Sequence, residues 1–327
     1  MRWKRLAGLS LLIAGLMAAG AIVTDRRASA REAAAEAAYP PEGEIVTVEG
    51  RRVQAVVRGS GPDLVLIHGS NGSIRDFSFD MIDRLSREFR VIAFDRPGLG
   101  WTDRADDRYG GRFSGAAESP QEQAALLAAA ARRLGAEKPL VVGHSYGGSV
   151  ALAWALDHDP AAVVMLAGVA NPWPGRLHWL HRVNGTALGG GIAVPLIAAF
   201  VPDARVRRSI EGVFGPQAMP EGYADHIGIG MVLRRAVFRA NARQVNTLRP
   251  HVVEMHARYD DLRLPIEIVH GDADDTVPIA IHSGPLSERV ESARLTILPG
   301  VGHMPHHTDP EAVTDAIRRA AERAGLR

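Results

Sequence analysis

One short segment of the sequence has the residue types and spacing of a nucleophilic serine. Gly143, Ser145 and Gly147 form a G-x-S-x-G pattern between an apolar, strand-like run and a helix-like stretch. The pattern suits a sharp strand-to-helix turn, because residues without side chains let the turn close beside the serine. The Ser145 hydroxyl would then stand at a helix N-terminus, where the backbone N–H of Tyr146 can stabilise a developing negative charge. We therefore predict Ser145 as a nucleophile and Tyr146 as an oxyanion donor, against the alternative of an ordinary tight turn.

A serine nucleophile needs a base, and His303 is the candidate. It lies in a Gly-rich loop after the predicted strand Arg294–Leu298, and such a loop can carry a histidine to the serine. A surface or metal-binding histidine is the alternative, because His306 and His307 are near, but the sequence identifies no further ligand. We therefore expect no metal and interpret His306 and His307 as loop or packing residues.

The orienting acid should lie in the loop that follows the preceding strand. That loop contains three carboxylates, Asp272, Asp274 and Asp275. An aspartate in a turn commonly bonds its own backbone, so local chemistry alone leaves the three open. The loop after the earlier strand is a poorer place for the acid, because no carboxylate follows Asn171 until Asp203.

A second oxyanion donor is expected from the loop His68-Gly69-Ser70-Asn71-Gly72, which follows the predicted strand 63–68. Its two glycines and its position fit a loop that offers a backbone N–H to an oxyanion. We expect this donor to be Ser70, with Asn71 second, and a plain Gly-rich turn is the alternative. His68 is expected to fix the loop rather than to act as a base.

The elements that position these residues alternate from residue 44 onward. A hairpin is expected at 44–49 and 52–58, further strands at 63–68, 90–95, 139–143, 162–169, 265–270 and 294–298, and helices at 74–87, 120–134, 149–157 and 308–324. Strands separated by helix-sized stretches predict a mostly parallel, doubly wound α/β sheet. Residues 171–258 lack a comparable strand and contain amphipathic pieces at 206–214 and 227–248, which predicts a helical lid on the ligand side of the sheet.

Four blocks together resemble the α/β-hydrolase superfamily, in its serine-nucleophile form. They are the HGSNG loop, the Asp95–Gly100 turn, the GHSYGG elbow, and the paired GDADDTVP and GVGHMPHH loops. The resemblance spans residues 44–327 except the lid, and it implies Asp274 as the acid. It also implies that the Asp95–Gly100 turn is structural. Haloalkane dehalogenases and epoxide hydrolases share several blocks but use an aspartate where this chain has Ser145, so neither chemistry is expected.

The resemblance implies acyl transfer to water on a small hydrophobic ester, without a cofactor. A cofactor-free haloperoxidase or perhydrolase and a C–C bond hydrolase would use the same triad, and a non-catalytic membrane-anchored binding protein is an alternative of another class. We expect the lid to form the acyl pocket wall, with most of its large apolar residues in the lid core. These residues are Trp173, Leu177, Trp179, Leu188, Ile192, Leu196, Phe200, Phe214 and Met231.

The N-terminal segment differs in composition from the rest of the chain. Basic residues within positions 1–5 precede the uncharged apolar run Leu6–Val23. A signal core needs about 7–15 residues and a membrane span about 17–25, so an uncleaved anchor and a signal cleaved at Ala28-Ser29-Ala30 both stay open. Either would carry the enzyme out of the cytoplasm, membrane-anchored in the first case and secreted or periplasmic in the second. Residues 31–38 are expected to form a short helical spacer before a Pro-rich linker.

The cysteine count and the net charge exclude several kinds of site and partner. The chain has 327 residues, no cysteine and a formal net charge of +1. A thiol nucleophile, a thiolate metal site and a disulfide scaffold are therefore excluded, and the near-neutral charge gives no footprint for nucleic acid. We expect residues 1–43 to be anchor or signal plus linker, residues 44–170 and 259–327 the hydrolase core, and residues 171–258 the lid.

Overall fold

The computed structural model describes residues 2–175, 177 and 179–326, and the side chains of Arg2, Lys4, Arg5 and Leu180 lie outside the description. Arg176 and His178, within the predicted lid, and the terminal residues Met1 and Arg327 also lie outside it. An eight-stranded sheet has the order β1-β2-β4-β3-β5-β6-β7-β8. The strands are β1 (Glu44–Val48), β2 (Arg51–Arg58), β3 (Asp63–Ile67), β4 (Arg90–Phe94), β5 (Leu140–His144), β6 (Ala162–Leu166), β7 (Ile266–Gly271) and β8 (Ala293–Leu298).

Strand pairing follows the sequence pattern. The predicted hairpin is β1 with β2, an antiparallel pair, and β2 also pairs antiparallel with β4. From β4 to β8 every pair is parallel. The carboxyl ends of β3, β5, β7 and β8 therefore meet at one edge, which brings together the loops that carry the predicted site residues. The predicted mostly parallel α/β sheet is confirmed.

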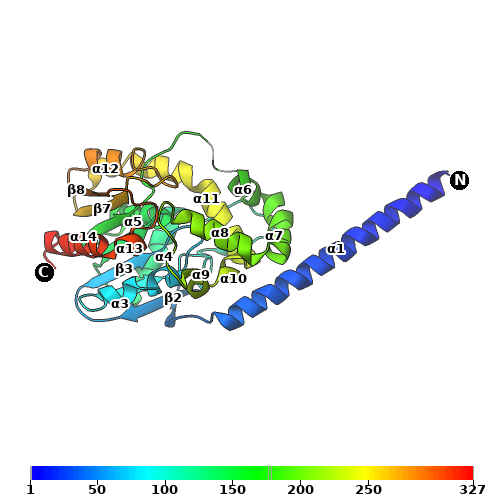
Figure 1. Cartoon of the computed structure of the whole chain (residues 1–327), viewed down its shortest axis with the longest axis horizontal. Helices are drawn as coiled ribbons and strands as arrows, with labels where there is room; N and C mark the ends of the chain where they lie inside the picture. Colours follow the sequence, from blue (N-terminus) through cyan, green and yellow to red (C-terminus); the bar gives the residue numbers. More distant parts are fainter. Residues whose placement is uncertain (1, 176, 178, 327) are drawn as a thin grey trace.

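Helices cover both faces of this sheet (Figure 1). The helices are α1 (Arg2–Ala38), α2 (Ile74–Ser78), α3 (Met81–Leu85), α4 (Pro120–Arg133), α5 (Tyr146–Asp157), α6 (Trp179–Asn184), α7 (Val194–Phe200), α8 (Asp203–Val213), α9 (Tyr223–Ile227), α10 (Ile229–Val232), α11 (Arg235–His256), α12 (Ser283–Arg289), α13 (Pro305–Thr308) and α14 (Pro310–Arg323). Single turns of 3-10 helix lie at Asp107–Tyr109 and Tyr259–Asp261, and one π-helical turn, Gly189–Ala193, leads into α7.

Two buried clusters, one on each face of the sheet, form the core. Residues that alternate along β3 illustrate the arrangement: Val65 and Ile67 belong to the cluster under α4, α5 and α11, whereas Leu64 and Leu66 belong to the cluster under α2, α3 and α14. A strand covered on both faces needs apolar residues at every position, which explains the continuous apolar runs in the sequence. The sheet is thereby fixed as a rigid platform for the loops at its edge.

Several predicted elements differ in extent from those observed. The single helix expected at 74–87 is two short helices, α2 and α3, because a turn at residues 79–80 separates them. The helix expected at 308–324 is α13 followed by α14, with a new N-cap at Asp309, whose side chain accepts from Ala312 N. Strand β6 ends at Leu166 rather than at residue 169, since the chain turns at Ala167, which has a φ of 45°.

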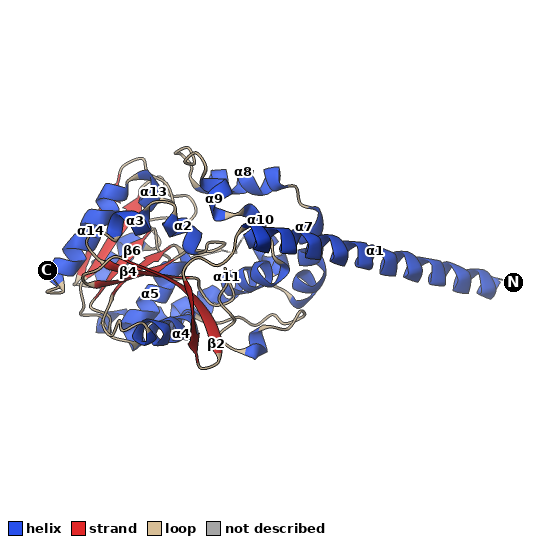
Figure 2. Ribbon diagram, turned by 90° about the horizontal axis from the view of Figure 1, so that it is seen from below, coloured by secondary structure: helices blue, strands red, loops and turns tan. Residues whose placement is uncertain are grey.

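The N-terminal segment is one continuous helix. Helix α1 runs without a break from Arg2 to Ala38, so the predicted spacer at 31–38 is its last part rather than a separate short helix. Its stretch Leu6–Ala38 is long and apolar enough to cross a membrane, and the most apolar window of that stretch is entirely exposed. Figures 1 and 2 both show α1 leaving the globular part at the end that carries α7.

Candidate active site

Ser145 occupies a sharp turn between β5 and α5. Its backbone has a φ of 53° and a ψ of −117°, a conformation that L-residues rarely adopt. The flanking glycines make the turn possible, since a Cβ on Gly143 would overlap the carbonyl of Gly147, and one on Gly147 would overlap the carbonyl of Ile67. The turn is held by a hydrogen bond from Ser145 N to Leu166 O at 2.9 Å. The structure thus places the Ser145 side chain at the N-terminus of α5.

Three predicted site residues from distant loops lie in one hydrogen-bonded chain. The Nε2 atom of His303 is 2.9 Å from Ser145 Oγ, and its Nδ1 atom is 2.7 Å from Asp274 Oδ2. His303 and Asp274 are buried at 3% and 6% exposure, and Ser145 keeps 8%. Because His303 bridges a hydroxyl and a carboxylate, it can accept the serine proton while the carboxylate stabilises the resulting imidazolium.

The Asp274 carboxylate is fixed by its own loop and by His270. Its Oδ1 atom accepts from the backbone N–H groups of Thr276 and Val277, both at 2.9 Å, and His270 Nε2 lies 3.0 Å from Oδ2. Burial acts to raise the pKa of Asp274, but the hydrogen bonds from His270 and His303 outweigh it and hold that pKa well below its ordinary value. Asp274 is therefore ionised at neutral pH, which the predicted role of an orienting acid requires.

The other two carboxylates of this loop do not reach His303. Asp272 accepts from Gly300 N at 2.6 Å, which links its loop to the loop after β8, and Asp275 is exposed. Of the three candidates, Asp274 is the one that the structure brings to the histidine.

The loop expected to hold the second oxyanion donor lies against the nucleophile. A Cβ built on Gly69 would be 3.0 Å from Ser145 Cβ, so the loop backbone passes directly beside the serine. The N–H of Asn71 donates to Asn241 Oδ1 at 2.7 Å and is already used. This favours the N–H of Ser70 over that of Asn71 as the second predicted oxyanion donor. The first predicted donor is the N–H of Tyr146, the first residue of α5.

His68 is fixed in the role that the sequence suggested. Its Nε2 atom accepts from the backbone N–H of Arg96 at 3.0 Å, and its Nδ1 lies 2.9 Å from Gly69 O. Complete burial, with Arg96 adding to it, lowers the pKa of His68 to about 3, so the ring stays neutral and holds the loop. The Arg96 guanidinium also stacks 4.2 Å from the ring centroid of Tyr146, which ties the Asp95–Gly100 turn to the elbow.

A second buried network lies behind His303. Asp76 accepts from Tyr223 Oη at 2.7 Å and contacts His307 Nε2 at 2.8 Å and His306 Nε2 at 3.2 Å. Burial opposes ionisation of Asp76, but the two histidines outweigh it and hold the pKa of Asp76 well below its ordinary value. His144 lies next to this group and its Nε2 atom is 3.0 Å from His303 O. The network therefore braces the loop that carries His303.

The side chains of Asp76, His306 and His307 offer ligand atoms within 4.8 Å of one another, a spacing that a metal ion can use. Their hydrogen bonds within the group already account for their proximity. His306 and His307 are packed and hydrogen-bonded beneath the loop, and Asp76 is the further potential ligand that the sequence alone did not identify.

Sequence reasoning missed four residues that support this site: Asp76, His144, His270 and Asn241. His270 carried a local signal, because it ends β7 only four residues before Asp274. Asp76 and Asn241 carried none, since their partners lie 230 and 170 residues away in the chain. Contacts of that range depend on how helices pack on the sheet.

The expectation that most large apolar residues of segment 171–258 form a lid core is wrong for five of the nine. Phe214 and Met231 are buried, but an exposed group contains Trp179, Leu188, Ile192, Leu196 and Phe200, at 46–70% exposure. These side chains lie on α6, on the π-helical turn and on α7, and the lid core does not cover them.

Comparison with known proteins agrees with this fold and this spacing of loops. A model of the alpha/beta hydrolase family matches residues 64–316. An uncharacterized protein of Mycobacterium tuberculosis is 27% identical over 293 residues, covering 86% of this chain and 81% of the relative. An α/β hydrolase fold protein from Burkholderia ambifaria superposes with a TM-score of 0.68 at 24% identity, covering 84% of this chain and 96% of that one. A membrane phospholipase A, described as a bacterial virulence factor, superposes with a TM-score of 0.61 at 19% identity and covers 99% of both chains. The family match extends over more than half of the chain, which therefore belongs to the α/β-hydrolase family.

Proposed function

We propose that this hydrolase cleaves carboxylic esters through Ser145, His303 and Asp274. His303 accepts the Ser145 proton as Oγ bonds to the acyl carbon, and the N–H groups of Tyr146 and Ser70 stabilise the oxyanion. The C–O bond then breaks, and the alkoxide leaves with the proton from His303. Water, deprotonated by His303, releases the carboxylic acid from Ser145. The hydrogen-bonded chain from Ser145 through His303 to Asp274 is the observation that carries this proposal.

The substrate that we propose is an ester with a hydrophobic acyl group, and an acyl ester of a glycerophospholipid is the first to test. The similarity to a membrane phospholipase A supports it, because that likeness covers 99% of both chains and so includes the N-terminal helix. A lipid ester also suits an enzyme whose N-terminal helix carries an exposed apolar stretch long enough to cross a membrane.

We further propose that α1 is retained as a membrane anchor, with the catalytic part outside the cytoplasm. The small-residue site Ala28-Ser29-Ala30 lies within the continuous helix, and Ala28 is fully buried against Ala198 and Ala199 of α7. Arg235 donates to Ser29 Oγ at 2.8 Å and to Glu32 at 2.7 Å, which clamps the same stretch to α11. Cleavage there would remove part of a packed interface, and this favours the anchor over the cleaved signal.

The test is labelling of the full chain in detergent with a fluorophosphonate probe, followed by hydrolysis assays on phospholipids and on p-nitrophenyl esters of increasing chain length. We expect stoichiometric labelling at Ser145, and loss of labelling and hydrolysis in Ser145→Ala. The matched control is Ser287→Ala, which removes another helix-associated hydroxyl, on α12, and should leave both unchanged. A labelled protein that hydrolyses no ester but cleaves a C–C bond or forms peracids would overturn the ester assignment. An unlabelled, folded protein would overturn the nucleophile.

A further inference from the structure

An unusual row of exposed apolar side chains runs along the helix that leads into and through α7. Leu188, Ile192, Leu196 and Phe200, spaced four residues apart, are 70%, 57%, 46% and 48% exposed, and we call them the apolar stripe. Residues four apart lie on one face of a helix, so the four form a continuous surface. A soluble helix places such a row toward its core, and here the row faces outward.

The inner face of the same helix is already occupied. Val194, Ala198 and Ala199 are at most 2% exposed and pack against the rest of the molecule. The ring of Phe113, itself 58% exposed, lies directly over Gly191, where a Cβ would overlap it. The helix is therefore held in place by its buried inner face, and the apolar stripe is a second apolar face on its outer side.

The apolar stripe ends where the exposed apolar part of α1 ends. Arg27, one turn after Val23, donates its Nε–H to Ala199 O at 2.7 Å, and its guanidinium lies 5.3 Å from the ring centroid of Phe200. Figures 1 and 2 show, from two directions, that α7 lies at the end of the globular part from which α1 projects. A bilayer spanned by Leu6–Val23 would therefore meet the apolar stripe at its surface.

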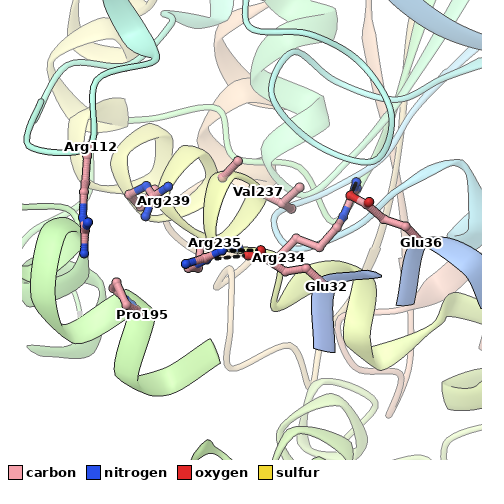
Figure 3. A pocket seen from close by; sticks show the side chains of 9 residues that line it. Glu32, Glu36, Arg112, Pro195, Arg234, Arg235, Val237 and Arg239 are labelled. Carbon is pink, nitrogen blue, oxygen red and sulfur yellow. Dashed lines mark hydrogen bonds and ion pairs between the residues drawn. The ribbon is translucent and has the colours of Figure 1, made fainter. Parts of the chain in front are cut away.

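Positive charge gathers beside the apolar stripe. A hollow of about 310 Å³, lined by Arg112, Arg234, Arg235 and Arg239 with Glu32 and Glu36, opens next to Pro195 of α7 (Figure 3). Arg235 and Arg234 pair with Glu32 and Glu36 at 2.7 and 3.1 Å. Arg112 instead donates to the carbonyl of Gly191 at 3.1 Å. Arg235 also pairs with Asp25 at 2.5 Å. The four arginines outnumber these three carboxylates, so the hollow has a net positive charge.

We propose that the apolar stripe rests in the interface of a phospholipid bilayer, with the arginine-lined hollow facing its anionic headgroups. The proposal rests on the proposed anchoring through α1 and deepens it, because it gives the catalytic part a fixed orientation on the membrane. Large apolar side chains inserted at headgroup depth, flanked by arginines, are the pattern by which interfacial helices bind membranes. A second copy of this chain would bring its own arginines against the same hollow, and this repulsion favours lipid as the occupant.

The absence of cysteine from the chain allows a direct test. Single Leu196→Cys, Leu16→Cys and Ile297→Cys variants of the full chain would each carry one polarity-sensitive NBD fluorophore, in vesicles of phosphatidylcholine and phosphatidylglycerol. Leu196 reports the apolar stripe and Leu16 the proposed anchor, both largely exposed in the structure. Ile297, 51% exposed on β8, is the matched control, because β8 lies at the opposite end of the molecule from α7 in Figure 1.

We expect a blue-shifted emission at positions 16 and 196, with at least twofold quenching by lipids brominated on the acyl chains, and water-like, unquenched emission at 297. Quenching at 16 with a water-like signal at 196 would overturn the membrane contact of the apolar stripe while the anchor stands. A blue shift at 196 without quenching by brominated lipid would assign the stripe to a second protein copy and overturn the proposal as well. Absence of quenching at both positions would overturn it together with the anchor. Fluorophosphonate labelling of the same samples reports the catalytic assignment separately, and an unchanged melting temperature shows that each variant folds.

Discussion

Asn241 and Asn71 form a reciprocal amide pair that joins segment 171–258 to the loop 68–72, in which we propose the second oxyanion donor. Asn241 Nδ2 donates to Asn71 Oδ1 at 2.7 Å, and Asn241 Oδ1 accepts from Asn71 N at 2.7 Å. The same Oδ1 accepts from Ser70 Oγ at 2.9 Å. A side chain of α11 therefore sets the position of the loop that lies beside Ser145, and Asn71 is held there with a φ of 56°.

We predict that Asn241→Ala lowers kcat about 10–100-fold with a smaller change in KM. A displaced oxyanion donor is lost mainly in the transition state. Complete removal of one such donor costs about 2.7–4 kcal/mol, or about 10²–10³-fold in kcat, and we expect a displaced donor to cost less. Steady-state kinetics on a short p-nitrophenyl ester would measure the split, with Thr247→Ala on the same helix as the control. A change in KM alone would show that Asn241 shapes binding rather than the oxyanion loop.

We predict that Asp274→Asn keeps the fold and lowers kcat by about 10³–10⁴-fold. The amide cannot stabilise the imidazolium of His303 and favours the wrong tautomer of that ring. Measurements of kcat and of the rate of fluorophosphonate labelling would check this, because both rates depend on His303 acting as a base. Asp275→Asn, which changes an exposed carboxylate of the same loop, should leave both rates unchanged. Equal losses in the two variants would remove Asp274 from its proposed role.

Asp76 is expected to contribute stability rather than chemistry. In Asp76→Asn, the amide cannot accept from Tyr223, His306 and His307 together, so buried donors lose their partner at about 1–3 kcal/mol. Urea unfolding should show the loss, and kcat at a temperature well below unfolding should fall less than in Asp274→Asn. Unchanged stability would show that this network does not brace the His303 loop.

Asp95 gives a pH-dependent prediction. Complete burial raises the pKa of Asp95 to about 6, against the opposing effect of hydrogen bonds from Ile74 N and Trp101 N. Because the folded state then binds this proton more tightly than the unfolded state, Asp95 lowers stability progressively as the pH rises from about 4 to about 6.

The variant Asp95→Asn does not titrate and removes this dependence. The difference in unfolding free energy, wild type minus variant, should therefore fall by up to about 3 kcal/mol across that pH range and stay constant above it. Urea titrations at intervals of half a pH unit would measure it. A difference independent of pH would show that burial does not raise the pKa of Asp95 above its value in the unfolded chain. Taking the difference cancels the contributions of the buried histidines, which are common to both proteins.

Local sequence was sufficient for features that depend on local sterics. The G-x-S-x-G turn was predictable because only glycine fits where a Cβ would overlap a backbone carbonyl, as at Gly143 and Gly147. His303 and the loop of Asp274 were predictable because both follow recognisable apolar strands. Choosing Asp274 from three aspartates needed the family resemblance, since nothing local distinguishes a carboxylate that meets a histidine from one that caps a turn.

The sequence by itself determined the α/β sheet, the elbow at Ser145 and the apolar character of Leu6–Val23, because strand patterns, tight turns and uncharged runs are set by neighbouring residues. Only the tertiary structure decided that Asn241 holds Asn71, that Asp76 joins His306 and His307, and that α1 is clamped by Arg235. It also decided that the apolar stripe faces outward. The sequence alone does not distinguish an apolar helical residue that packs into the core from one that faces a membrane. That distinction depends on which face of the helix packs against the rest of the protein.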